Sequence, residues 1–317
     1  MDLQELLFIC RKSHEDSLYK DTGHKILSGF SGYKLCGLLQ NLTSKLEGTQ
    51  NVYLEIGVYQ GLTLLSNACS NKNVKCYGID NFSLFNEGGK NKDIVLERKK
   101  VLNANNAHII DKDFEEALDD LDKYFEKGEK VGVFFIDGAH DYRSQLISLL
   151  KIKKYLSNDA LIVIDDANYA HVRQATVDFL MTEPEFKLIC EAYTKAHPAN
   201  LSKIDKEHSI KGWWNGINII TKDENIILDN MIPEIDLINR NFHFKNHDVM
   251  RSKYTEILFD LSNLCQELIN SNESESEIIN SIKELINKQN EIASGRFEHH
   301  NTYSEGLPEF KINKLKK

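Results

Sequence analysis

Apolar runs of strand length recur along the first two thirds of the chain, and helical patterns lie between most of them. Alternation of this kind predicts βαβ units and a mostly parallel, doubly wound sheet that is covered on both faces. We therefore expect an α/β fold. The expected strands are residues 52–58, 74–79, 107–111, 131–136, 160–164, 186–193 and 215–221, and the expected helices between them are 62–69, 114–125, 142–156 and 172–181.

The flanking segments have a different pattern. Residues 1–50 read as two helices with a glycine-rich joint at Gly29 and Gly32. From about residue 223 the composition shifts to Asn, Glu, Lys and Ile, and helical periodicity returns over 253–270 and 275–293. We expect an N-terminal helical segment (1–50), a central ligand-binding domain (51–222), and a C-terminal helical extension (223–317) whose last residues, 294–317, are loosely ordered.

Composition narrows the functional class. The formal net charge of −9 argues against nucleic acid as the main partner, because such binding depends on neutralising phosphates. The six cysteines are scattered without a CxxC pair, which favours a reduced, cytoplasmic protein over a cysteine zinc site. No apolar stretch reaches about 18 residues, so neither a membrane span nor a membrane partner is expected.

Acidic residues stand where the predicted strands end. Glu55, Asp80 and Asp137 each close an apolar run, and Asp165 and Asp166 close another. Ligands of open α/β sheets bind outside the carboxyl ends of the strands. We therefore expect these acids to line one crevice, where the first two suit a nucleoside and the last three suit a metal ion or a general base.

The loop after the first strand reads Glu-x-Gly-x-x-x-Gly, through Glu55, Gly57 and Gly61. Glycines let a backbone turn sharply and approach a ligand closely, but the spacing differs from the GxGxxG of dinucleotide folds. A nucleoside that carries an amino-acid part therefore fits better than a dinucleotide. Asp80 is placed to accept both ribose hydroxyls, and Asp113 to receive an adenine amino group.

Two runs of residues carry a family resemblance. Tyr53 to Gly61 (YLEIGVYQG) and Phe135 to Tyr142 (FIDGAHDY), joined to Val163 to Asp166 (VIDD), resemble class I S-adenosylmethionine-dependent methyltransferases. More narrowly, they resemble the macrocin-type sugar O-methyltransferases and their cephalosporin-type relatives, over about residues 50–221.

The resemblance implies a Rossmann-like sheet of order 3-2-1-4-5-7-6 with its last strand antiparallel. It also implies S-adenosylmethionine in the crevice between strands one and four. The cofactor-binding residues expected from the pattern and the resemblance together are Glu55, Gly57, Tyr59, Gly61, Asp80, Asp113 and Asp137.

In that strand order, Asp137 ends beside Asp165 and Asp166. Three neighbouring carboxylates repel one another, so a proton or a divalent cation must relieve the repulsion. The resemblance maps metal ligands onto these three residues, and Mg²⁺ suits such a set. The metal would hold two hydroxyls of a small acceptor, such as a sugar of a natural product or surface glycan, and His140 would take the proton.

Several alternatives stay open at this point. A metal-free N- or O-methyltransferase would use His140 or Asp137 as its catalytic base, with His171 as another candidate, and Asn168 is a spare metal ligand. A non-catalytic nucleoside-binding scaffold is a rival from another class. Trp213 and Trp214 either form an aromatic wall for the acceptor or pack against the last strand. Acceptor specificity is expected in residues 1–50, 82–95 and 195–214, and a homodimer or higher homo-oligomer is favoured.

Overall fold

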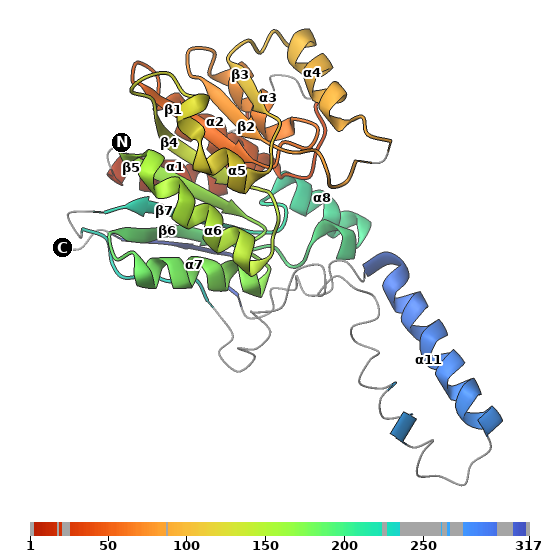
Figure 1. The fold of residues 1–317 in the computed structure, drawn as a ribbon. Coiled ribbons are helices and arrows are strands. Elements are labelled where there is room, and N and C mark those ends of the chain that lie inside the picture. The colour runs from red at the N-terminus through yellow and green to blue at the C-terminus, as the bar shows by residue number, and fades with distance from the viewer. Residues whose placement is uncertain are drawn as a thin grey trace.

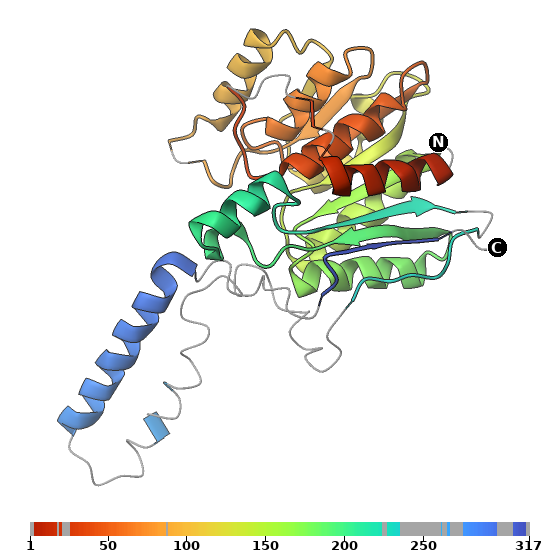
Figure 2. The same ribbon diagram turned by 180° about the vertical axis from the view of Figure 1, so that it is seen from behind.

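The computed structural model describes residues 3–17, 19–20, 26–86, 88–223, 227–234, 261, 265–266, 275–296 and 307–314. Within these residues a sheet of eight strands forms the central layer, and helices cover both of its faces (Figures 1 and 2). One face packs against α1 (Leu3–Asp16), α2 (Tyr33–Ser44) and α3 (Leu62–Ser70). The other packs against α5 (Phe114–Asp119), α6 (Tyr142–Ile152) and α7 (Ala170–Thr182).

The strands follow the order β3-β2-β1-β4-β5-β7-β6-β8. The order 3-2-1-4-5-7-6 expected from the resemblance is therefore confirmed, with one strand added at its edge. The first five strands pair in parallel, and β7 runs antiparallel to both β5 and β6. Their bounds are β1 Asn51–Ile56, β2 Cys76–Ile79, β3 Ala107–Ile110, β4 Lys130–Ile136, β5 Leu156–Asp165, β6 Phe186–Ala192, β7 Ile217–Lys222 and β8 Phe310–Ile312.

The four helices expected between the strands are present, and two of them are shorter than expected. Residues 121–123 form a separate 3-10 turn, η1 (Leu121–Lys123), and residues 153–155 form another, η2 (Lys153–Tyr155). Helix α6 begins where the side chain of Asp141 accepts a hydrogen bond from the amide of Ser144, as expected of a residue that caps a helix.

Two helices were not among those predicted from the sequence. They are α4 (Asn91–Val101) and α8 (Lys203–Lys211), which is preceded by the 3-10 turn η3 (Pro198–Asn200). Each helix buries few side chains, so neither carries the apolar periodicity that a sequence pattern detects. In α4, an acid in the first turn and three basic residues in the last turn complement the helix dipole instead.

The N-terminal segment is fixed against the turn before β7. The amide of Lys34 donates a hydrogen bond to the carbonyl of Gly212 at 3.0 Å. A Cβ atom at Gly32 would overlap the same carbonyl, so the glycine-rich joint predicted from the sequence permits this close approach. The joint therefore holds residues 29–31 beside the carboxyl ends of the strands.

The last residues of the chain were predicted to be loosely ordered, but part of them joins the sheet. Phe310–Ile312 form β8, which pairs antiparallel with β6, and the buried side chain of Asn313 donates hydrogen bonds to the carbonyls of Leu188 and Asp229. Helix α11 (Glu275–Arg296) matches the helix expected at 275–293 and extends away from the sheet (Figure 1). Most of the helix expected at 253–270 lies outside the described residues. Nowhere in the described part is a helix long and apolar enough to cross a membrane.

Candidate active site

A cavity of about 650 Å³ lies at the carboxyl ends of the parallel strands, where the sequence predicts the ligand. Its wall follows the loops after the first five strands, from Phe114 at one end to Trp214 at the other. Residues 29–31 and 197–199, together with Lys206 of α8, close the remaining sides. The cavity thus extends from the expected nucleoside side of the sheet to the strand ends that carry the catalytic candidates.

Gly57 brings the first loop against the end of β4. Its φ of +91° lies in the left-handed region, and a Cβ atom there would overlap the carbonyl oxygen of Asp137. The Asp137 amide in turn donates a hydrogen bond to the Ile56 carbonyl at 2.9 Å. Only glycine permits this contact, which makes the β1 and β4 ends one continuous wall.

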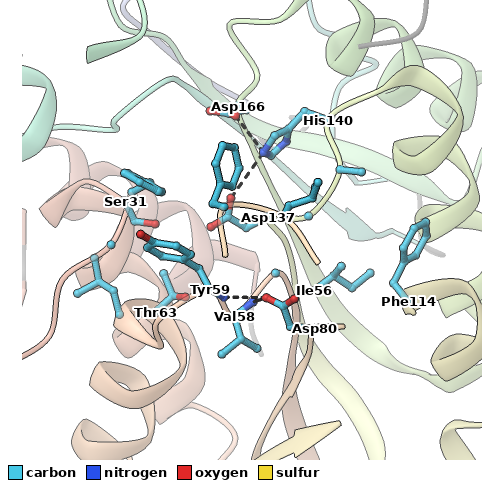
Figure 3. Close-up of a pocket in the computed structure, with 18 of the residues that line it drawn as sticks. Ser31, Ile56, Val58, Tyr59, Thr63, Asp80, Phe114, Asp137, His140 and Asp166 are labelled. Carbon is cyan, nitrogen blue, oxygen red and sulfur yellow. Dashed lines mark hydrogen bonds and ion pairs between the residues drawn. The ribbon is translucent and has the colours of Figure 1, made fainter. Parts of the chain in front are cut away.

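Asp80 lines the cavity and shapes it (Figure 3). Its Oδ2 atom accepts hydrogen bonds from the amides of Val58 and Tyr59 at 2.9 and 2.8 Å, and its Oδ1 atom accepts one from Phe82 at 2.7 Å. A carboxylate has about four acceptor sites, so capacity for a further donor remains. Asp80 therefore fixes the loop after β1 while its carboxylate borders the cavity.

Glu55 lies behind the cavity wall and does not line it. The hydroxyl of Tyr53 donates to its carboxyl at 2.6 Å and the hydroxyl of Thr63 at 3.2 Å, and Thr63 itself lines the cavity. Burial raises the pKa of Glu55 to about 8, against the lowering effect of these hydrogen bonds. Gly61, another predicted cofactor ligand, precedes α3 as its N-cap with a φ of +83° and does not line the cavity. The remaining predicted cofactor ligands line it: Gly57, Tyr59, Asp113 and Asp137.

Asp113 stands at the far end of the cavity beside Phe114. One of its carboxyl oxygens accepts a hydrogen bond from the amide of Glu115 at 2.9 Å and caps α5. The capping role and a position on the cavity wall are therefore combined in one residue. Lys112 and Asn81 border the same end.

His140 lies between two acids at the other end (Figure 3). Its Nε2 atom is 3.0 Å from Oδ2 of Asp166 and 3.8 Å from Oδ1 of Asp137. The side-chain amide of Asn215 donates to the other oxygen of Asp166 at 2.8 Å. Burial alone would raise the pKa of Asp166, but His140 and Asn215 lower it below its usual range, so Asp166 remains an anion.

The pKa values of Asp137 and Asp165 shift upward, in the opposite direction to that of Asp166. Burial raises the pKa of Asp137 well above its usual range, and the charges of Asp165 and Asp166 raise it further. Burial and the charge of Asp166 likewise raise the pKa of Asp165. Asp165 is buried on the strand face that packs against α2, and it does not line the cavity. The predicted proximity of the acids is thus present, but only Asp137 and Asp166 reach the cavity.

The three predicted Mg²⁺ ligands do not all face the cavity. Asp165 stays behind the wall, and Asp166 is engaged by His140 and Asn215. The described part of the chain contains no group of three or more His, Cys, Asp or Glu side chains that could hold a metal ion. Asn168, the spare ligand, donates its side-chain amide to the carbonyl of Thr194 at 2.9 Å.

The two tryptophans have different environments. Trp214 lines the cavity, whereas Trp213 is buried and its Nε1 atom donates to Nδ1 of His14 at 3.2 Å. Trp214 is thus at the cavity, as an aromatic wall for the acceptor would require, and Trp213 is in the core. His171, the other candidate base, is buried under the ring of Tyr169 and does not line the cavity.

Sequence reasoning missed Phe30 and the residues around it. Phe30 lines the cavity and stacks on Tyr59, with ring centroids 4.8 Å apart. Its position between Gly29 and Gly32 was a signal, because the glycine-rich joint brings this short segment against the strand ends. No periodicity marks the residue, because it belongs to neither helix.

Backbone strain gathers around the cavity. Tyr59, Phe85, Asp166 and Trp214 all line it and all have positive φ angles, between 48° and 62°. This conformation costs a side-chain-bearing residue about 1–2 kcal/mol. Strain that persists at such cost is concentrated at functional sites in proteins.

Comparison with known proteins gives a family match over the site. Residues 54–167 match the family model described as a methyltransferase domain. An uncharacterized protein of Acanthamoeba polyphaga mimivirus is 28% identical over 132 residues, which cover 41% of this chain. The match spans 57% of the length of that viral protein.

Two solved structures are similar in part. An O-methyltransferase from Bacillus cereus in complex with SAH is 16% identical, covers 70% of this chain and all of its own, and has a TM-score of 0.47. The O-methyltransferase TomG from Streptomyces achromogenes, involved in tomaymycin synthesis and in complex with SAM, is 14% identical, with coverages of 69% and 89% and a TM-score of 0.42.

Proposed function

We propose that this protein is an S-adenosylmethionine-dependent methyltransferase that methylates a hydroxyl oxygen of a small acceptor. The observation that carries the proposal is the single cavity whose wall includes both Asp80 and the His140–Asp166 pair. The methyltransferase-domain match over residues 54–167 covers these same strand ends. The sheet order, determined from the strand pairing, agrees with the proposal.

The donor would bind along the first three strand ends. Asp80 has remaining acceptor capacity for ribose hydroxyls, and Asp113 and Phe114 border the position of the base. Tyr59, Thr63 and Asp137 line the way toward the catalytic end. When bound, S-adenosylmethionine supplies an electrophilic methyl group on a positively charged sulfur, and acids on the wall favour that charge.

The acceptor hydroxyl must lose a proton as its oxygen bonds to the methyl carbon. We assign this proton to His140, because Asp166 remains anionic 3.0 Å from its Nε2 atom and stabilises a cationic imidazole. The products are the methyl ether, the demethylated donor and one proton, so charge and atoms balance. The rest of the rate enhancement would come from holding donor and acceptor in line inside the cavity.

Magnesium assistance is a separate mechanism, and the arrangement of the acids does not favour it. Of the three predicted ligands, only Asp137 and Asp166 line the cavity, and His140 lies close to both of them. The metal-free mechanism, with His140 as base, fits this geometry better. Turnover in the presence and absence of EDTA separates the two mechanisms, because metal-assisted methylation stops when the cation is removed.

The test of the proposed function is calorimetric titration of S-adenosylmethionine into the purified protein. We expect micromolar binding, with or without EDTA, that is lost in Asp80→Ala. Asp111→Ala is the matched control, because Asp111 follows the next strand and pairs with Lys92 outside the cavity. The absence of binding in the unmodified protein would refute the proposed function, and binding without methyl transfer to any hydroxylated acceptor would favour a nucleoside-binding scaffold.

The partners follow from the same proposal. A cavity of about 650 Å³ suits a cofactor with a small acceptor, and the net charge of −9 argues against nucleic acid. We also propose a homodimer or higher homo-oligomer in the cytoplasm. Light scattering of the purified protein tests the oligomeric state.

A further inference from the structure

Phe30 is the centre of an aromatic rim at the catalytic end of the cavity. Its ring is 4.8 Å from that of Tyr59, 6.0 Å from that of Phe85 and 6.1 Å from that of Trp214, measured between centroids. The four residues come from different segments of the chain, and all four line the cavity. We call Phe30, Tyr59, Phe85 and Trp214 the aromatic rim.

The rim is costly to maintain in two ways. Phe30 and Phe85 leave 50% and 58% of their surfaces exposed, although large apolar side chains gain free energy when they are buried. Three of the four residues, Tyr59, Phe85 and Trp214, also have left-handed backbone conformations that disfavour side chains. Packing alone does not account for Phe85, whose backbone is strained and whose ring is exposed, or for the exposed ring of Phe30.

Polar side chains border the rim but do not interrupt it. The cavity wall carries Asp137, His140 and Asp166 at the strand ends, and Ser31, Ser83 and Lys206 line it as well. His197 sets its ring edge-on to Trp214. A sugar presents hydroxyl groups around its whole ring and needs several polar side chains to pair them. The rim offers ring faces instead, and aromatic rings prefer stacked or edge-to-face partners.

We propose that the acceptor is a planar, aromatic hydroxyl compound whose ring contacts the aromatic rim while its hydroxyl faces His140. The inference rests on the proposed function and deepens it, and it departs from the sugar acceptor expected from the family resemblance. Phe30 is then the main specificity-determining residue for the acceptor. The exposed rings of Phe30 and Phe85 become covered when the acceptor ring binds, which supplies the apolar contact that they lack in the free protein.

The two tryptophans provide a direct measurement. They are the only two in the sequence, and Trp214 borders the cavity while Trp213 is buried behind it. We would load the protein with S-adenosylhomocysteine and titrate 3,4-dihydroxybenzoate and resorcinol as planar probes, with glucose and methyl rhamnoside as sugar probes. Planar probes should change the tryptophan emission, and Trp214→Phe should remove that change.

The variant that tests the rim is Phe30→Ala, and its matched control is Phe8→Ala. Phe8 lies on α1 away from the cavity and is 59% exposed, so its replacement removes an apolar surface similar to that of Phe30. Loss of ring contacts in Phe30→Ala should weaken planar-probe binding about tenfold, as expected for about 1.4 kcal/mol of aromatic contact. Phe8→Ala should bind as the unmodified protein does.

Three outcomes would overturn the inference. Binding of the sugars without the planar probes would show a sugar site, and equal probe affinities in Phe30→Ala and Phe8→Ala would remove the rim from acceptor recognition. Both outcomes leave the proposed function intact if calorimetry shows that S-adenosylmethionine binds. A failure of S-adenosylmethionine to bind would instead refute the proposed function, and this inference with it.

Discussion

The Nε2 atom of His140 lies 3.0 Å from Oδ2 of Asp166, across the gap between the carboxyl ends of β4 and β5. This contact keeps one acid of the site charged. It keeps the pKa of Asp166 low, while the pKa values of Asp137 and Asp165 are raised by burial and by neighbouring carboxylates. One wall of the cavity therefore combines the Asp166 anion, an imidazole and the carboxyl group of Asp137, which favours its neutral form, while Asp165 lies behind that wall.

Replacement of His140 by Asn should separate binding from chemistry. We expect His140→Asn to lower kcat about 10²–10⁴-fold, the range typical of general base catalysis, with the affinity for S-adenosylmethionine unchanged. His108→Asn is the control, because His108 stacks on Tyr77 and does not line the cavity. Steady-state kinetics and calorimetry on both variants provide the test. An undiminished kcat in His140→Asn would assign the proton to another group.

Replacement of Gly57 by Ala should abolish donor binding. The added Cβ atom would overlap the carbonyl of Asp137, which must move and open the cavity wall. Gly88→Ala is the matched control, because Gly88 also has a positive φ, of +79°, but a Cβ atom added there would meet no other atom within 4 Å. In the control, the free energy of unfolding should fall only by the cost of backbone strain, about 1–2 kcal/mol. Calorimetric titration and urea unfolding compare the two variants, and similar effects in both would leave backbone strain as the cause.

Glu55 should make the stability of the protein depend on pH. Its folded-state pKa is about 8, above the ordinary value of 4.5, because of burial. Between these two values the folded state holds a proton that the unfolded state has released, so stability falls as pH rises. The loss should be complete above about pH 8 and on the order of 5 kcal/mol.

Replacement of Glu55 by Gln should remove this dependence. Gln is uncharged and similar in shape; its amide oxygen can accept a hydrogen bond from one of the two hydroxyls, Tyr53 or Thr63, and its NH₂ group can donate to the other. Urea unfolding at about pH 5 and about pH 9 should show a flatter profile for Glu55→Gln, with the variant more stable than the unmodified protein at the higher pH. Parallel profiles would mean that Glu55 is ionised in the folded protein.

The edge strand β8 should contribute measurably to stability. The buried amide of Asn313 donates to the carbonyls of Leu188 and Asp229 at 2.8 and 2.9 Å, and Asn313→Ala leaves both without this donor. We expect a loss of about 1–3 kcal/mol in the free energy of unfolding. Lys187→Ala is the control from the neighbouring strand β6, because its Nζ atom donates to Asn230 in an exposed hydrogen bond. Equal stability of the two variants would contradict a structural role for the Asn313 contact.

The sheet was predictable from the sequence because its core strands are continuous apolar runs that end in acids. That pattern located Asp80, Asp137 and Asp166 at one cavity. It did not distinguish Asp165, which lies behind the wall, from Asp166 beside it, because the positive φ of 55° at Asp166 turns the chain there. Phe30 and β8 depend on contacts between residues far apart in the sequence, and α8 buries too little to show a pattern.

The pairing of β8 with β6 has a consequence for how the protein is made. Among the described residues, the chain leaves the sheet after β7, and the next strand that joins its edge is β8, which begins at Phe310. During translation, the ribosome must add residues 223–309 before that strand exists, and until then β6 presents an open row of amides and carbonyls. Such edges invite pairing with other chains. The nascent protein therefore passes through a period in which its domain is nearly folded but its sheet is unprotected, and a slow ribosome or a truncated transcript would prolong that exposure.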